Sequence, residues 1–286
     1  MQAIRAAGAK YVVLVAKHHD GFCLWPTAQT DYSVKASPWE DGHGDVVGDV
    51  AKAARKYGLK FGIYLSPWDR HDPRYKDAAA YDRYYEAEMS ELASNYGDLV
   101  EWWLDGAGSA GHVYDFRKYM ETLRTYQPNT VVFADTGLFE YGDARWVGNE
   151  DGFVPYEDWD AIDRHGFVRW RPVEADTPLH KRHWFWHPND EATLKTVPEL
   201  LTTWDETVGR GAQLRRSGAA STDRTVKVPP AAALQVNCPS TLNAADTPPG
   251  PLRRMRAAGT YPADSSLSSL IRVETWTEPW LLVSWL

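Results

Sequence analysis

Short apolar runs alternate with longer amphipathic segments along roughly the first 215 residues of the chain. The runs cover Tyr11–Ala16, Lys60–Leu65, Leu99–Leu104, Thr130–Phe133, Ala144–Val147, His183–Trp186 and Gly211–Leu214. Short continuous apolar runs of this kind are typical of strands buried on both faces. Between them the pattern predicts helices over Val46–Tyr57, Ala78–Tyr96 and Val113–Tyr126, because each segment ends next to a glycine or shortly before a proline.

The repeated order of strand, helix and strand predicts a parallel sheet with crossover helices. Both a closed (β/α)₈ barrel and a doubly wound open sheet satisfy that order. Polar or charged residues follow nearly every run, and in a barrel all those strand ends meet on one face. An open sheet would gather functional residues at a single switch point. We therefore expect an α/β protein with a (β/α)₈-type barrel over residues 1–214. Six or seven strands can be counted, so the barrel is expected to be incomplete at its N-terminus.

The remaining residues, 215–286, have a different character. From about Arg215 the periodicity gives way to Ala, Ser, Thr and Pro, which is typical of a tail that is disordered or loosely packed. Trp280–Trp285 is the apolar candidate for a strand that could fill a gap in the barrel, and we expect that it does not. An open barrel leaves backbone groups unpaired, so we expect the 286-residue chain to be marginally stable and weakly active.

Composition and charge narrow the classes of function. The chain carries 31 Lys and Arg against 39 Asp and Glu, a net charge of −8, which disfavours nucleic acid as a partner. No apolar run reaches the roughly 18–20 residues of a membrane span, and no signal peptide is visible. Two cysteines cannot form a disulfide framework. The 14 Trp and 15 Tyr suit faces that stack on sugar rings, although an aromatic core explains them equally well.

Two carboxylates follow apolar runs and are candidates for catalysis. Asp105 ends the run in Trp102-Trp103-Leu104-Asp105-Gly106, and Glu150 follows another in Gly148-Asn149-Glu150. Hydrolysis of a glycoside requires such a pair, one group to attack or stabilise the anomeric carbon and one to protonate the leaving oxygen. Asp105 could equally be a turn residue that caps the next element. Glu174 is a second candidate for the acid, and a structural loop carboxylate is its better interpretation.

A dense polar cluster, Lys17-His18-His19-Asp20, follows the first run. His and Asp are common metal ligands. Side chains alternate along a strand, however, so both imidazoles reach one ion only if the strand ends between them. Hydrogen bonding to sugar hydroxyls is the favoured interpretation, and a buried His beside a capping His is the structural alternative.

These motifs together resemble the α-L-fucosidases of glycoside hydrolase family 29. The resemblance rests on Lys17–Phe22, Gly62–Ser66, Trp102–Gly106, Gly148–Glu150, Trp184–His187 and Val208–Ala212, in the family's order over residues 1–214. It implies an irregular (β/α)₈ barrel and a retaining mechanism without a metal or other cofactor. The family's opening segment has no counterpart here, and the chain departs from the family after Leu214.

Site residues are carried over from the family position by position. The resemblance implies that Asp105 is the nucleophile and Glu150 the acid/base. The Gly-Asn-Glu context of Glu150 is similar to that of the subfamily that cuts α-1,3/1,4-linked fucose. The residues that line the sugar pocket would be His18, His19, Tyr64, Trp103, Arg145 and Trp184.

The expected function is therefore a retaining α-L-fucosidase acting on fucosylated oligosaccharides or glycoconjugates. An inactive sugar-binding remnant is the alternative from another class, and a metal-dependent hydrolase built on His18 and His19 is a third. Hydrolysis of an aryl fucoside separates the first from the second, and a chelator separates the first from the third. Members of the family are often secreted, periplasmic or lysosomal, whereas the sequence leaves the compartment and the oligomeric state open.

Overall fold

The computed structural model describes residues 1–106, 108–134, 142–155, 171–181, 183–184, 187–217 and 281–285, the last range and residues 216–217 by their backbone. The helices are α1 Gln2–Ala6, α2 Val46–Lys56, α3 Ala78–Asn95, α4 Phe116–Tyr126 and α5 Val197–Thr207. The strands are β1 Tyr11–Lys17, β2 Lys60–Leu65, β3 Glu101–Leu104, β4 Val131–Ala134, β5 Arg145–Trp146, β6 Val173–Pro178, β7 Gln213–Ser217 and β8 Leu281–Trp285.

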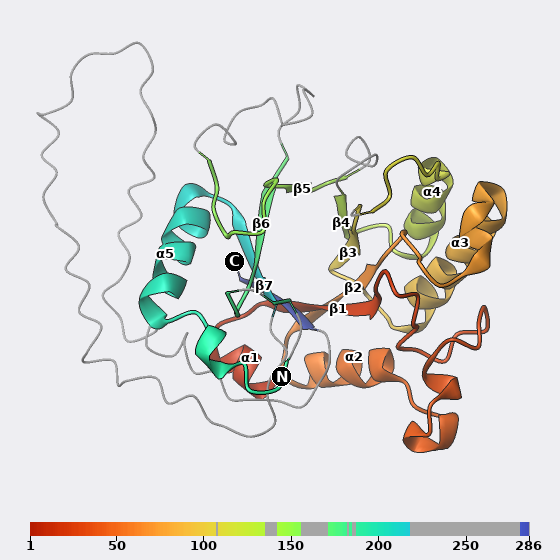
Figure 1. The fold of residues 1–286 in the computed structure, drawn as a ribbon, viewed down its shortest axis with the longest axis horizontal. Coiled ribbons are helices and arrows are strands. Elements are labelled where there is room, and N and C mark those ends of the chain that lie inside the picture. Colours follow the sequence, from red (N-terminus) through yellow and green to blue (C-terminus); the bar gives the residue numbers. More distant parts are fainter. Residues whose placement is uncertain are drawn as a thin grey trace, which may run out of the picture.

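The strands form one sheet in the order β4-β3-β2-β1-β8-β7-β6-β5. A parallel bridge between Phe133 and Ala144 joins β4 to the start of β5 and closes the sheet into a barrel. Figure 1 shows α2, α3 and α4 around the half that contains β1–β4, and α5 beside β6 and β7. The expected (β/α)₈-type barrel is confirmed.

Side chains alternate between two apolar layers along β1. Val12 and Leu14 point outward into the core between the barrel and the helices. Tyr11, Val13 and Val15 point inward, where they meet aromatic residues from β2, β3 and β4. Burial on both faces explains why β1 and β2 read as continuous apolar runs in the sequence.

The helices begin where the sequence supplies a capping side chain. Asp45, Asp77 and Asp115 accept backbone N–H groups at the starts of α2, α3 and α4. Thr196 and Glu199 form a capping box at the start of α5. Such caps satisfy backbone donors that have no partner within the helix. None of the helices in the described part of the chain is long and apolar enough to cross a membrane.

The strand predicted over His183–Trp186 is wrong. His183 and Trp184 lie outside any strand, while Phe185 and Trp186 lie outside the described residues. The strand of this region is β6, which begins ten residues earlier at Val173. Glu174 and Asp176 both lie on the inner face of β6. Because these inward positions carry charged residues, the sequence of β6 has no continuous apolar run.

The region after Leu214 also departs from the expectation. Strand β7 continues to Ser217, and β8 lies between β7 and β1, antiparallel to both. The expectation that the tail supplies no strand is therefore wrong for residues 281–285, whose apolar sequence pairs with two strand edges. Residues 218–280 lie outside the described residues, and the marginal stability of the chain stays a prediction.

An ion cluster occupies the interior of the barrel. The Arg215 guanidinium from β7 contacts the carboxylates of Glu101 on β3 and Glu174 on β6. It also lies 5.5 Å from the ring of Trp103 and 5.7 Å from that of Tyr11. All three charged side chains are almost fully buried. A buried cation between two carboxylates explains how β7 can continue through Arg215 where an apolar residue would be expected.

We expect Arg215→Ala to lower the free energy of unfolding by about 3–5 kcal/mol, because it leaves two buried carboxylates without their cation. Chemical denaturation measures this change. The control is Arg117→Ala, which removes an arginine whose side chain is 75% exposed on α4, and its effect should stay within about 0.5 kcal/mol. Equal effects of the two variants would contradict a structural role for the Arg215 cluster.

Candidate active site

The polar residues that follow β1, β2 and β3 meet at one end of the barrel. Because the three strands are parallel neighbours, their carboxyl ends lie side by side. Asp105 follows β3, and its Oδ2 accepts a hydrogen bond of 2.7 Å from the Tyr64 hydroxyl on β2. His19 follows β1 and brings its Nε2 to 3.5 Å from the same oxygen. The structure thus brings Asp105, Tyr64 and His19 together, and their role as a sugar site stays a prediction.

A bulge at the end of β1 sets the directions of the side chains there. The pairing of β1 with β2 shifts between Val15 and Lys17. Such a bulge re-aims the residues that follow it. Lys17 points outward to α3, where its Nζ lies 2.5 Å from Glu88 Oε2 and 3.3 Å from Asp69 Oδ2. Burial lowers the pKa of Lys17, but the charges of Glu88 and Asp69 raise it well above its ordinary value, so the side chain stays cationic.

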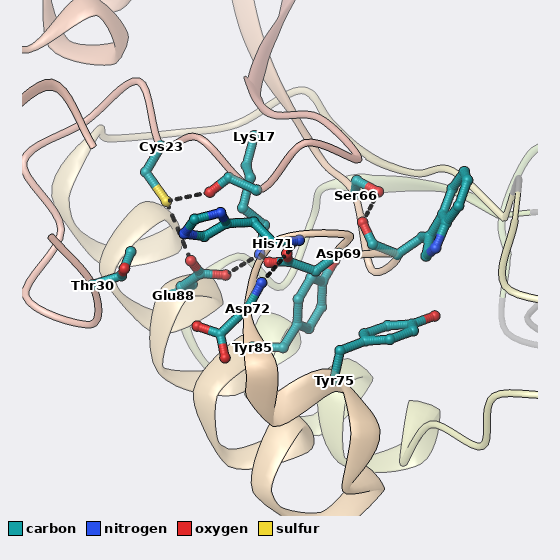
Figure 2. A network of polar contacts seen from close by, with 12 residues as sticks. Lys17, Cys23, Thr30, Ser66, Asp69, His71, Asp72, Tyr75, Tyr85 and Glu88 are labelled. Carbon is teal, nitrogen blue, oxygen red and sulfur yellow. Dashed lines mark hydrogen bonds and ion pairs between the residues drawn. The ribbon is translucent and has the colours of Figure 1, made fainter. Parts of the chain in front are cut away.

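Asp69, in the loop after β2, contacts Lys17 at the end of β1, as Figure 2 shows. Its Oδ1 accepts the backbone N–H groups of His71 and Asp72, both at 2.8 Å. Gly21 lies against the same oxygen, and a Cβ at Gly21 would come within 2.6 Å of it. Gly21 also has a φ of +78°, which favours glycine. The turn that carries His18 and His19 is thus fixed by a buried charge network.

The two imidazoles lie together at the mouth of the barrel. Their ring centroids are 4.0 Å apart, and His18 stacks on Tyr64 with centroids 5.6 Å apart. Burial lowers the pKa of both rings, in His19 to about 4, with His18 adding to the effect and Asp105 opposing it. Both imidazoles are therefore neutral at pH 7. Strand β1 ends at Lys17, before both histidines. The alternation of side chains along a strand therefore does not apply to His18 and His19, and the two rings can face the same site.

The hydrogen bonds of Ser66 fix the tautomer of His19. Ser66 donates its hydroxyl proton to the carbonyl oxygen of Trp68 at 2.8 Å. Its oxygen must then accept the proton of His19 Nδ1, which lies 2.7 Å away. A neutral imidazole carries one N–H, so His19 Nε2 presents a lone pair to the pocket.

Stacked aromatic rings form the wall of the pocket. Trp103 lies between Tyr64 and Phe133, with ring centroids 5.2 Å and 4.0 Å away. The Trp103 indole donates from Nε1 to Glu174 Oε1 at 2.6 Å. Glu174 is thus 2% exposed and engaged by both Trp103 and Arg215. These contacts favour the structural interpretation of Glu174 over a role as acid.

Glu150 lies in the turn after β5 and is exposed. The Trp184 indole donates from Nε1 to Glu150 Oε2 at 2.9 Å. Glu150 also lines a cavity of about 450 Å³ together with Thr177, Lys181, Lys195 and Thr203. The structure therefore joins two residues that the sequence named separately, Glu150 and Trp184. Phe185 and Trp186, which follow Trp184 in the same sequence motif, lie outside the described residues.

Comparisons with known proteins identify the family of the chain. The profile of the family Alpha-L-fucosidase matches residues 1–214. Alpha-L-fucosidase 1 of Arabidopsis thaliana is 38% identical over 230 residues, which are 73% of this chain and 44% of that protein. The chain belongs to the α-L-fucosidase family.

Solved structures support the same assignment. A glycoside hydrolase 29 family member from a rumen bacterium is 35% identical with a TM-score of 0.67, covering 76% of this chain and 43% of that one. A Ruminococcus gnavus GH29 fucosidase in complex with fucose is 29% identical with a TM-score of 0.65, covering 76% and 52%. This member of the α-L-fucosidase family thus spans about half the length of the relatives it matches.

The sequence analysis missed Asp176 as a pocket residue. Asp176 lies two positions after Glu174 on β6, so both side chains face the interior, and it accepts a hydrogen bond of 2.6 Å from Trp146 Nε1. Burial raises the pKa of Asp176 to about 7; the Trp146 bond lowers it, while the charges of Glu150 and Asp105 add to the rise. Asp176 therefore lies close enough to both candidate carboxylates, Asp105 and Glu150, for their charges to raise its pKa. The two-residue spacing from Glu174 was the feature of the sequence that could have placed Asp176 on the same face of a strand.

Arg145 occupies the alternate position on β5. The register pairs Trp146 with Glu174 and Arg145 with Val173. Trp146 thus shares the inner face with Glu174, and Arg145, which is 2% exposed, lies on the other face of the strand. A contact of Arg145 with the sugar stays a prediction.

We expect the folded state of this fucosidase-family chain to lose part of its stability as the pH rises from about 4 to 7. Over that range the native state holds a proton on Asp176 that the unfolded state has lost, so raising the pH favours unfolding. Asp176→Asn removes this contribution, and the variant should lose roughly 1–3 kcal/mol less than the wild type between pH 5 and pH 7.5. Denaturation curves at both values measure it, with the exposed Asp98→Asn as control. Parallel pH dependence of the wild type and Asp176→Asn would contradict the raised pKa.

Proposed function

We propose that the chain is a retaining α-L-fucosidase that hydrolyses α-linked fucose from oligosaccharides or glycoconjugates. The observation that carries the proposal is the position of Asp105. A carboxylate at the end of a barrel strand is held by Tyr64 beside two neutral imidazoles and an aromatic wall, in a chain of the α-L-fucosidase family.

Asp105 is the proposed nucleophile. Its side chain is 23% exposed, so a substrate can reach it, and the Tyr64 hydroxyl orients one of its oxygens. Attack of a carboxylate oxygen on the anomeric carbon breaks the bond to the leaving oxygen and forms a fucosyl ester. Water then attacks the same carbon and releases Asp105, so two inversions retain the configuration.

Glu150 is the proposed acid/base. It gives its proton to the leaving oxygen in the first step and takes a proton from water in the second. Its exposure lets it exchange protons with solvent, and the Trp184 indole holds its carboxylate in place. The cavity beside Glu150 gives the saccharide part of the leaving group a place to bind.

The pocket offers specific contacts to the sugar. His19 Nε2 accepts a hydrogen bond from a fucose hydroxyl, because Ser66 fixes the tautomer. His18 is a second partner for the hydroxyls, and the aromatic wall of Tyr64 and Trp103 receives the methyl group. The Gly148-Asn149-Glu150 context supports a preference for α-1,3/1,4-linked fucose as part of this proposal.

We expect Glu150→Ala to lower kcat/KM on a fucosylated oligosaccharide by about 10²–10⁴-fold and to affect 4-nitrophenyl α-L-fucoside far less, because an activated leaving group needs little protonation. Steady-state kinetics on the two substrates measures the difference. Glu174→Ala is the matched control: it should alter both substrates alike, since Glu174 acts through the fold.

The same kinetics can defeat the proposal. Selective loss on the oligosaccharide in Glu174→Ala, with Glu150→Ala unaffected, would move the acid role to Glu174. A wild-type protein that binds fucose and hydrolyses neither substrate would identify a sugar-binding protein without catalysis.

A further inference from the structure

His19 Nε2 and Asp105 Oδ2 lie close together at one end of the barrel. These two atoms are 3.5 Å apart, and His19 Nδ1 lies 2.7 Å from the Ser66 hydroxyl. The Tyr64 hydroxyl already donates to that carboxylate oxygen. A histidine nitrogen and a carboxylate oxygen are both common ligands of metal ions.

The separation of these atoms suits a metal ion. Bonds of about 2.0–2.1 Å at tetrahedral angles place two ligand atoms of zinc about 3.4 Å apart. Nε2 and Oδ2 already have nearly this spacing. His18 supplies a third ligand, and one atom from each of His18, His19 and Asp105 lies within 4.8 Å of the others. Among the described residues, no other three His, Cys, Asp or Glu side chains bring ligand atoms this close together.

We propose that His18, His19 and Asp105 bind a zinc ion, and that zinc and the sugar exclude each other from the pocket. Zinc binding stands on the three ligands alone, whereas the competition also rests on the proposed function. The bound ion covers the proposed nucleophile and the acceptor for the sugar hydroxyl, so zinc is a competitive inhibitor. A chelator would then raise, and never lower, the activity of a zinc-loaded preparation.

The surroundings of the three ligands support this choice of ion. Ser66 orients His19 and Tyr64 orients Asp105, which are the outer contacts that fix ligands around a metal. Two imidazole nitrogens favour zinc over Mg²⁺ or Ca²⁺, which prefer oxygen ligands. Zinc can also meet a second pair of imidazoles, His183 and His187, whose rings are 4.2 Å apart near Asp190. The experiment must therefore separate the two places.

Calorimetric titration of the full chain with zinc chloride tests the metal site directly. We expect His19→Gln to weaken zinc binding at the pocket by at least about tenfold, and Ser66→Ala, which frees the tautomer, to weaken it by roughly tenfold. Two controls should retain the pocket affinity: His43→Gln, at an exposed position, and the double variant His183→Gln/His187→Gln. Magnesium chloride should give no binding at the pocket.

L-Fucose provides a test that needs no variant. On the wild type, the apparent Kd for zinc at the pocket should rise linearly with the concentration of L-fucose, starting from its value without the sugar. Retained zinc affinity in His19→Gln would overturn the metal site. Independent binding of zinc and L-fucose would overturn their mutual exclusion. A wild type that binds zinc through His19 but binds no L-fucose would uphold the metal site and contradict the proposed function instead.

Discussion

The buried ammonium group of Lys17 donates to Glu88 and Asp69, and these two contacts join strand β1, helix α3 and the loop after β2. Three charges without access to water are tolerated because each has a partner, and the removal of any one would leave the others uncompensated. The contacts also determine how the side chains at the end of β1 are oriented. They turn Lys17 away from the pocket, hold the glycine turn against Asp69, and leave His18 and His19 facing Asp105.

A second charge cluster lies inside the barrel and distinguishes two buried carboxylates from the proposed catalytic pair. Arg215 compensates Glu101 and Glu174 in the interior, where Trp103 also donates to Glu174. Asp105 and Glu150 retain access to solvent, and their carboxylates accept hydrogen bonds from Tyr64 and Trp184. The two carboxylates of the proposed mechanism are thus ones that water can reach.

The sequence predicts an element well when its partners are apolar and local. Strand β2 matches its predicted range because Lys60–Leu65 is a continuous apolar run. Strand β6 was missed because Glu174 and Asp176 face the interior, and the residues that neutralise or bind them, Arg215, Trp103 and Trp146, lie far away in the sequence. Burial of a charged strand depends on partners that periodicity does not reveal.

The candidate site shows the same division. Asp105, Tyr64, His18 and His19 were expected together, since each follows or ends a strand of a parallel barrel. Their geometry could not be predicted, because it depends on the bulge in β1 and on the hydrogen bonds of Ser66. Asp176 was overlooked for the same reason as its strand.

The central claim is that Asp105 forms a covalent bond to fucose during hydrolysis. Incubation of the chain with 2-deoxy-2-fluoro-L-fucosyl fluoride tests it most directly, because fluorine at C2 slows the second step and lets the ester accumulate. Mass spectrometry of the intact protein and of its peptides then locates the label. The account predicts one fluorofucosyl group per active chain, on Asp105. A label on another carboxylate, or steady turnover of an aryl fucoside with no covalent adduct, would contradict it.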